Sequence, residues 1–101
     1  MMVIRCLVEQ MNEELEDAKK YARYATKYRS SRKALSDTYL TLGKEELGHF
    51  LRLNDQASQV IEAARQAGKV PSSSMMELYN YEHDKIMDTY ACTKVLIESI
   101  K

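Results

Sequence analysis

Apolar residues recur every three or four positions along most of the chain, which is the spacing of one face of an α-helix. Two short segments break this pattern. The first is RSSRK (29–33), where Ser30 or Ser31 is suited to stop one helix and cap the next. The second is AGKVPSSS (67–74), which concentrates residues that end helices. The pattern predicts a single all-α domain over residues 1–101, with helices over about 3–29, 32–67 and 74–100.

The segment 67–74 carries signals for both a helix end and a helix start. Gly68 suits a left-handed C-cap, because glycine has no Cβ to clash in that conformation. Pro71 is unable to continue a helix. Ser74 and Glu77 have the spacing of a capping box, which predicts that the last helix begins at about Ser74.

Each predicted helix carries a mainly apolar stripe that is interrupted by ionisable residues. Glu14 interrupts the first stripe, Glu46 and His49 the second, and His83 the third. The stripes read Ile4, Leu7, Met11, Glu14, Ala18, Tyr21, Ala25 and Tyr28; Leu35, Tyr39, Leu42, Glu46, His49, Leu53, Gln56, Val60, Ala64 and Ala67; and Met76, Tyr79, His83, Ile86, Tyr90, Thr93 and Ile97. We expect these stripes to face the core of a bundle of nearly parallel or antiparallel helices.

Ionisable residues in a core-facing stripe need partners. Burial of one unpaired carboxylate costs several kcal/mol, and the stability of a whole domain is only about 5–15 kcal/mol. Glu14 precedes the segment 29–33 by about 15 residues, and Glu46 and His49 follow it by about 13 to 16. In an antiparallel hairpin the three side chains therefore lie at one level. Two carboxylates and an imidazole predict a site for a divalent transition ion, with iron (Fe) first and manganese or zinc next.

Two other interpretations of this pattern stay open. A Glu-x-x-His spacing alone is common on solvated helix faces. The prediction of a metal site therefore depends largely on Glu14 lying at the same level as Glu46 and His49. The same residues also fit a polar network in the core, or a helix rotated away from the expected orientation. His83 is a further candidate ligand, and Glu82 or Asp84 would then lend a carboxylate.

The segments EELEDAKKYARYA (13–25) and KEELGHFLRL (44–53) resemble ferritin-like diiron proteins, especially rubrerythrin-like and short encapsulated-ferritin proteins. In that family a glutamate on the first helix, with a tyrosine seven residues later, joins a Glu-x-x-His on the second helix. The matching residues here are Glu14, Tyr21, Glu46 and His49. The resemblance covers about residues 4–60, and helix 74–100 matches small rubrerythrin-like proteins more weakly. A CxxC-type rubredoxin site is absent from the sequence.

The resemblance implies a mononuclear or dinuclear metal site and oxidation of Fe(II) by oxygen or peroxide, in iron handling or oxidant protection. A full ferritin-like bundle has four helices and two ligand sets, whereas this chain predicts three helices and one set. Two hairpins from different copies would complete the bundle in a homodimer or larger homo-oligomer; alternatively, His83 completes a site within one chain.

Tyr21 and Tyr39 are candidates to donate an electron to the metal or to bond a ligand carboxylate, and ordinary core packing is the other reading. Glu13 and Glu16 form a candidate outer pair for cation entry, against the reading of ordinary surface acids. The rival function is a non-enzymatic interaction protein whose buried polar residues set the packing register.

The charge composition limits the classes of partner that we expect. With 15 basic and 15 acidic residues the net charge is zero, so we expect neither nucleic acid nor a membrane as partner. A basic run is balanced by neighbouring acids and is read as a solvated face: Lys19, Lys20, Arg23, Lys27, Arg29, Arg32 and Lys33.

Cys6 and Cys92 match no zinc or redox spacing and predict reduced, buried thiols in a cytoplasmic protein. Gly48, inside the second helix, predicts either a close helix approach beside the ligands or an uncompensated weak spot.

Overall fold

The computed structural model describes residues 2–69 and 72–101, and these ranges form three α-helices without any strand. The helices are α1 (Met2–Tyr28), α2 (Lys33–Gln66) and α3 (Ser73–Glu98). The all-α prediction is confirmed, and each predicted boundary lies within one or two residues of the observed one. Pro71, predicted to break the helix, lies outside the described residues.

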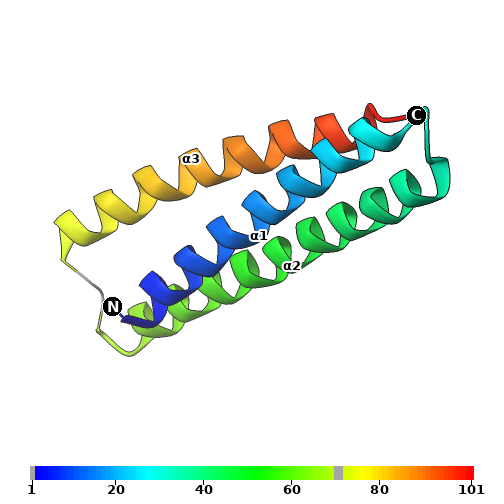
Figure 1. Cartoon of the computed structure of the whole chain (residues 1–101). Coiled ribbons are helices and arrows are strands. Elements are labelled where there is room, and N and C mark those ends of the chain that lie inside the picture. Colours follow the sequence, from blue (N-terminus) through cyan, green and yellow to red (C-terminus); the bar gives the residue numbers. More distant parts are fainter. Residues whose placement is uncertain (1, 70–71) are drawn as a thin grey trace.

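The helices run up, down and up along one long axis (Figure 1). α1 and α2 form an antiparallel hairpin, and α3 returns parallel to α1 and contacts both. The molecule measures 56 × 18 × 17 Å, so it is three times as long as it is wide. The N-terminus lies at the end where α2 passes into α3, and the C-terminus lies at the end of the α1–α2 turn.

The α1–α2 turn is held by side chains that the sequence pattern did not single out. Arg32 is the N-cap of α2 and makes no side-chain capping bond, so the prediction that Ser30 or Ser31 caps this helix is wrong. Instead, the buried Ser36 hydroxyl donates a 2.6 Å hydrogen bond to the Ala25 carbonyl and ties the two helices together. Arg29 also bonds Asp37 across the turn, and this hydrogen bond lowers the pKa of the Asp37 carboxyl.

The ends of α2 and α3 follow the predicted residue types with one shift. Gly68 has a φ of +70° and ends α2 in the left-handed conformation that its missing Cβ permits. The hydroxyl of Ser72 caps α3 and accepts a bond from the Met75 N–H, so the predicted capping box at Ser74 is wrong. Three successive serines have equal capping ability, and the sequence alone does not select which of them is used.

The core includes Met11, Ala18 and Ala25 of the predicted α1 stripe, whereas in α2 it is displaced from the predicted stripe by one residue. In α1 the fully or nearly fully buried residues include Leu15 and Ala22, while Glu14 is only half-buried. In α2 Leu47 and Phe50 are buried, while His49 is exposed. Successive residues point about 100° apart on a helix, so this shift places the predicted α2 stripe, together with Glu14 of α1, at the edge of the core. The central core cluster is Met11, Leu15, Ala18, Ala22, Leu47, Phe50, Ile86 and Ile97.

A glycine permits the closest contact between the helices, but not the glycine that was expected. A Cβ added at Gly43 would lie 3.3 Å from Ile97 Cδ1 of α3 and 3.6 Å from the Ala18 carbonyl of α1. A Cβ at Gly48 would meet nothing within 4 Å, so the close approach predicted there is wrong. Gly43 therefore sets the spacing of the three helices at this level.

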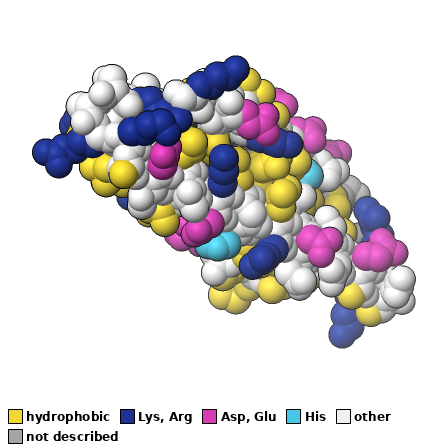
Figure 2. Space-filling model, turned by 90° about the vertical axis from the view of Figure 1, so that its right-hand side faces the viewer, with side chains coloured by type: hydrophobic (Ala, Val, Ile, Leu, Met, Phe, Trp, Pro, Cys, Tyr) yellow, Lys and Arg dark blue, Asp and Glu magenta, His cyan; other side chains and the backbone are white. Residues whose placement is uncertain are grey.

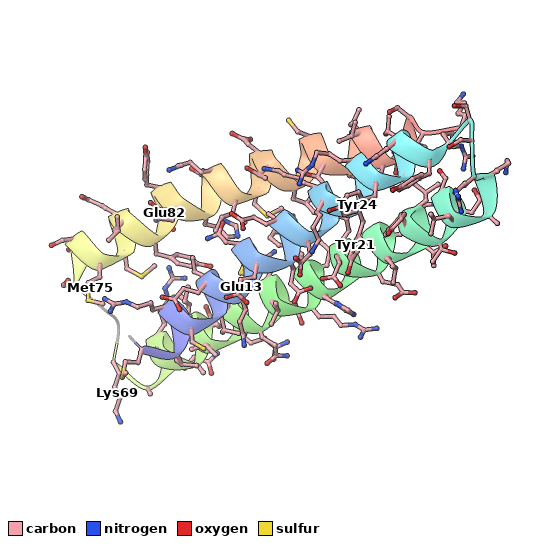
Figure 3. All side chains as sticks on the ribbon, viewed as in Figure 1. Glu13, Tyr21, Tyr24, Lys69, Met75 and Glu82 are labelled. Atoms are coloured by element: carbon pink, nitrogen blue, oxygen red, sulfur yellow. The ribbon has the colours of Figure 1, made fainter. Side chains whose placement is uncertain are left out.

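The first half of α3 packs loosely against the hairpin. Its buried residues are Ile86, Thr93 and Ile97, all beyond the middle of the helix. In the first half, Leu78 and Tyr81 are 63% and 61% exposed. Met75 and Glu82 mark this half of the helix in Figure 3. The stable contact of α3 with the hairpin is thus made by its C-terminal half.

The surface mixes both signs of charge with hydrophobic side chains (Figure 2). Basic residues of the predicted run take part in local contacts: Lys20 lies 3.9 Å from Asp17, and Lys33 lies 3.2 Å from Asp37. Cys6 and Cys92 are free and exposed, so the prediction that they are buried is wrong. Both lie on helix faces that point away from the core cluster, where a small side chain is tolerated without packing.

Candidate metal centre

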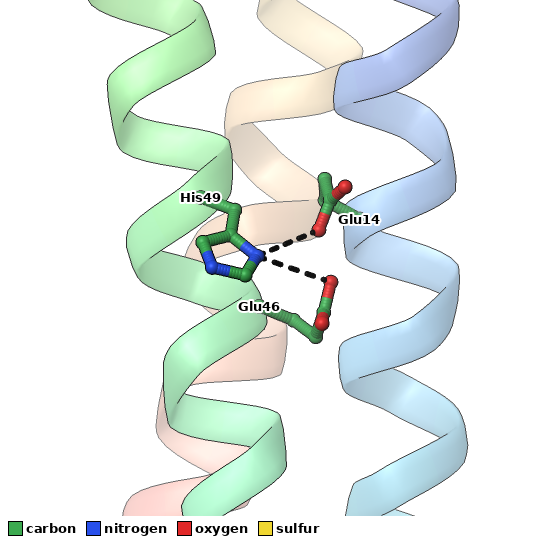
Figure 4. Close-up of side chains that lie close together, drawn as sticks. All are labelled: Glu14, Glu46 and His49. Atoms are coloured by element: carbon green, nitrogen blue, oxygen red, sulfur yellow. Dashed lines mark hydrogen bonds and ion pairs between the residues drawn. The ribbon is translucent and has the colours of Figure 1, made fainter.

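Glu14 of α1 and Glu46 and His49 of α2 converge at the middle of the hairpin (Figure 4). The His49 Nδ1 atom lies 3.2 Å from Glu14 Oε2 and 3.7 Å from Glu46 Oε2. Each residue offers one ligand atom, and these atoms all lie within 4.8 Å of one another. We call this group the Glu14–Glu46–His49 cluster.

The register of the hairpin produces this convergence. Gly43 lies against Ala18, which fixes the level of α2 relative to α1. The helices are antiparallel, so a residue one turn before Ala18 in α1 lies level with a residue one turn after Gly43 in α2. These two residues are Glu14 and Glu46. His49 follows Glu46 by three residues and so projects from the same side of α2.

The cluster lies on the face of the hairpin that α3 leaves open. In Figure 4 the three side chains lie between α1 and α2, and α3 passes behind them. The His49 side chain is 49% exposed, whereas those of Glu14 and Glu46 are 25% and 17% exposed. The cluster is therefore reached from solvent on its imidazole side and is shielded at its carboxylates.

The two carboxyl groups strongly disfavour being charged together. Burial, a hydrogen bond with Glu14 and the negative charge of Glu14 together raise the pKa of Glu46 to about 7. The charge of Asp17 also acts to raise this pKa, while His49 acts to lower it. At neutral pH without a cation, the Glu46 carboxyl is thus protonated for much of the time.

The geometry fits a small divalent cation. Carboxylate and imidazole ligands bind transition ions at about 2.0–2.2 Å, so two ligand atoms on one ion lie about 3–4 Å apart. The two distances from His49 Nδ1, 3.2 and 3.7 Å, fall in this range. A cation at this point would also relieve the repulsion between the two carboxylates.

A cavity of about 310 Å³ opens beside the cluster to solvent. Glu14 and His49 form one wall of the cavity, and Glu13, Gln10 and Arg52 are among the other lining residues. Of the two acids considered for cation entry, Glu13 borders this cavity and Glu16 is exposed outside it. The cavity leaves room for further small ligands beside His49.

Within the described ranges, neither His83 nor Tyr21 makes a hydrogen bond with the cluster. The His83 Nε2 atom lies 2.7 Å from Asn54 Oδ1, and its ring stacks on Tyr79, whose pKa is raised by burial. Tyr21 stacks instead on Tyr39, with ring centroids 6.1 Å apart. His83 therefore has partners on α2 and α3, and Tyr21 has a partner on α2.

Sequence reasoning missed two groups around the cluster. Asp17, one turn after Glu14, contributes to the electrostatics of Glu46. Tyr24 and Tyr28 join Tyr39 in an aromatic group on the same two helices. The available signal was the spacing of three and four residues that places Tyr21, Tyr24 and Tyr28 along one side of α1.

Comparisons with models of protein families, with curated protein sequences and with solved structures find no match to this chain. Among the helices of the described ranges, none is both long and apolar enough to span a lipid bilayer.

Proposed function

We propose that the Glu14–Glu46–His49 cluster binds a divalent transition-metal ion, with iron as the first candidate and manganese or zinc as alternatives. The observation that carries the proposal is the convergence of two shielded carboxylates and one accessible imidazole from two helices, with ligand atoms within 4.8 Å of one another. A mixed nitrogen and oxygen ligand set with open positions suits Fe(II).

The proposed chemistry is oxidation of Fe(II) to Fe(III) with oxygen or hydrogen peroxide as the electron acceptor, in iron handling or protection against oxidants. Glu14 and Glu46 supply negative charge, which favours the more highly charged Fe(III) product. Glu46 releases its proton when a cation binds, because its pKa is about 7 without one. His49 sets the position of the ion, and the adjoining cavity admits the oxidant.

We further propose that two copies pair through the open face of the hairpin, in a ferritin-like arrangement of four helices. One chain supplies three ligands, and two copies would supply six around a dinuclear site. The position of α3 on the other side of the hairpin supports this pairing, because it leaves the cluster free to face a partner. An apolar stripe at the edge of the core would be covered in the same step.

Metal titration of matched variants tests the proposal. We expect purified protein to bind Fe(II) or Mn(II) stoichiometrically, and Glu46→Gln and His49→Ala to weaken binding by about 10- to 100-fold or more. Glu45→Gln is the matched control, since Glu45 neighbours Glu46 in sequence but is exposed and lies outside the cluster. Metal content by mass spectrometry and Fe(II) oxidation by absorbance are read together with the mass in solution. Equal binding by wild type and Glu46→Gln would refute the assigned site.

A second candidate is an interaction protein in which the cluster is a polar network without metal. It is favoured by the 3.2 Å contact of His49 with Glu14, and no buried side-chain nitrogen or oxygen in the described ranges lacks a hydrogen-bond partner. On this reading, Glu46→Gln changes the oligomeric mass while iron has no effect on either protein. Stoichiometric metal binding that depends on Glu46 would exclude it.

A further inference from the structure

Four tyrosines gather on the hairpin between the cluster and the α1–α2 turn. Tyr21, Tyr24 and Tyr28 of α1 surround Tyr39 of α2, with ring centroids 6.1, 5.1 and 6.2 Å from that of Tyr39. We call this group the tyrosine cluster. Tyr21 and Tyr24 are seen in Figure 3 on the half of α1 that approaches the turn. Tyr39 is therefore the ring that contacts each of the other three.

Two of the four rings in the tyrosine cluster, those of Tyr21 and Tyr28, have a lysine ammonium group nearby. Lys20 Nζ lies 5.5 Å from the ring centre of Tyr21, and Lys27 Nζ lies 5.4 Å from that of Tyr28. A cation near a ring opposes removal of an electron from that ring, because the ring becomes positive. Electron loss is therefore favoured at Tyr24 and Tyr39 relative to the other two.

Tyr24 and Tyr39 are also the best placed pair for a reaction with each other. Their centroid distance of 5.1 Å is the shortest of the three, and Tyr24 is 38% exposed, so its ring has room to move. The two rings are tilted by 42° and are not stacked face to face, so a small rotation of the Tyr24 ring can bring an edge of each ring together. The carbons ortho to the hydroxyl groups lie on those edges.

The tyrosine cluster lies within reach of the proposed metal. Tyr21 follows Glu14 by seven residues, which corresponds to about 10 Å along a helix. Both groups belong to the same two helices, and Tyr21 stacks on Tyr39. Tyr21 thus connects the side of α1 that carries Glu14 with the Tyr24–Tyr39 pair.

We propose that Tyr24 and Tyr39 form an intramolecular dityrosine bond that joins α1 to α2 when iron at the Glu14–Glu46–His49 cluster passes electrons from the two phenols to hydrogen peroxide and returns to its starting oxidation state. The iron step rests on the proposed function, whereas the choice of the pair rests on the ring geometry alone. Each phenol loses one electron and its hydroxyl proton, and hydrogen peroxide takes up the two electrons and two protons and becomes two water molecules. A carbon–carbon bond forms between the ortho carbons, and the hydrogen on each of these carbons moves to the oxygen and restores the phenol.

The product can be assigned from tryptic peptides, because trypsin separates all four tyrosines. Cleavage at lysine and arginine places them in residues 21–23, 24–27, 28–29 and 34–44. We load the protein with Fe(II) without oxygen, add hydrogen peroxide in molar excess over the iron, because oxidation of Fe(II) itself consumes part of the peroxide, and record dityrosine fluorescence and peptide masses. We expect peptide 24–27 linked to 34–44 in protein of monomer mass. Tyr24→Phe and Tyr39→Phe should both lose the signal.

Tyr81→Phe is the matched control, since Tyr81 is 61% exposed on α3 and should leave the crosslink unchanged. Metal-free protein treated with a photo-excited ruthenium one-electron oxidant and persulfate should give the same 24–27 to 34–44 link. A different pair of peptides, or crosslinked dimers as the main product, would overturn the assignment of the pair.

The two proposals fail in distinguishable ways. If Fe(II) binds and is oxidised by peroxide but no dityrosine appears, the crosslink proposal is wrong and the metal site stands. If Fe(II) does not bind, the iron-driven step is wrong together with the proposed function, and the photochemical experiment alone reports on the pair.

Discussion

Glu46 has the least exposed carboxylate of the Glu14–Glu46–His49 cluster, and its pKa is raised to about 7. Its side chain is 17% exposed and faces a second carboxylate, so its charged form is unfavourable in the absence of a cation. An apolar residue at this position would pack without such a penalty. A residue that destabilises the metal-free fold is typical of a functional site, where local stability is given up for chemistry.

The raised pKa of Glu46 predicts a pH dependence of stability in metal-free protein. Its ordinary pKa is 4.5 and its folded pKa about 7, so the folded state holds the extra proton between these values. The contribution of this group to stability should therefore be greatest below pH 4.5. It should fall as the pH rises to about 7, by at most about 1.4 kcal/mol for each pH unit. Thermal unfolding from pH 4.5 to 8 measures this. Glu46→Gln should flatten the profile, and an unchanged slope would contradict the assignment.

The sequence predicted which residues of the site meet, but not all of their surroundings. Glu14, Glu46 and His49 could be aligned because an antiparallel hairpin with a short turn fixes levels by counting residues. His83 could not be placed in the same way, since the longer connection before α3 leaves its level and rotation undetermined. Its bond to Asn54 depends on how α3 docks, which is a tertiary property.

At the scale of helices, the three predicted elements were found, but the buried face of α2, and that of α1 near Glu14, lies one residue away from the predicted stripe. The hairpin helices carry two adjoining apolar stripes, and a walk at steps of three and four follows either one. α3 covers the stripe with Leu15 and Phe50 and leaves that with Glu14 and Glu46 at the edge. Periodicity gives the existence of an amphipathic helix more reliably than it gives the centre of the buried face.

The uneven packing of α3 predicts where the fold opens first. Residues 73–85 include no buried side chain, whereas Ile86, Thr93 and Ile97 anchor the second half. Amide hydrogen exchange should therefore be fastest, among the helical interiors, in the first half of α3, and slowest around Ala18 and Phe50 in the hairpin. Exchange followed by mass spectrometry of peptides resolves the two halves. Equal protection along α3 would show that its first half is covered in solution.

At the scale of the whole molecule, a long and narrow shape limits how much apolar surface one chain buries. With dimensions of 56 × 18 × 17 Å, most residues lie near the surface, and many side chains on the hairpin are half-buried. Pairing of chains is a common way for such a small helical unit to cover the remaining apolar face.

The proposed pairing predicts different effects for two leucine variants. Leu42 lies on the same stripe as Glu46 and is half-buried, while Leu78 on α3 is 63% exposed. Leu42→Glu should lower the mass in solution and weaken metal binding, because a charge would enter the paired face. Leu78→Glu should change neither. Light scattering after size-exclusion chromatography reports the mass, and circular dichroism checks that both variants fold. Dissociation by Leu78→Glu alone would place the contact on α3 instead.

Because α3 covers one stripe of the hairpin and the Glu14–Glu46–His49 cluster occupies the other, folding and the proposed metal chemistry would depend on largely separate sets of side chains. A library that keeps Leu15, Leu47 and Phe50 and varies the positions around Glu14 and His49 should yield folded proteins with a range of metal preferences. The hairpin thus offers a scaffold on which selection, natural or in the laboratory, can alter the reactive face without rebuilding the interior.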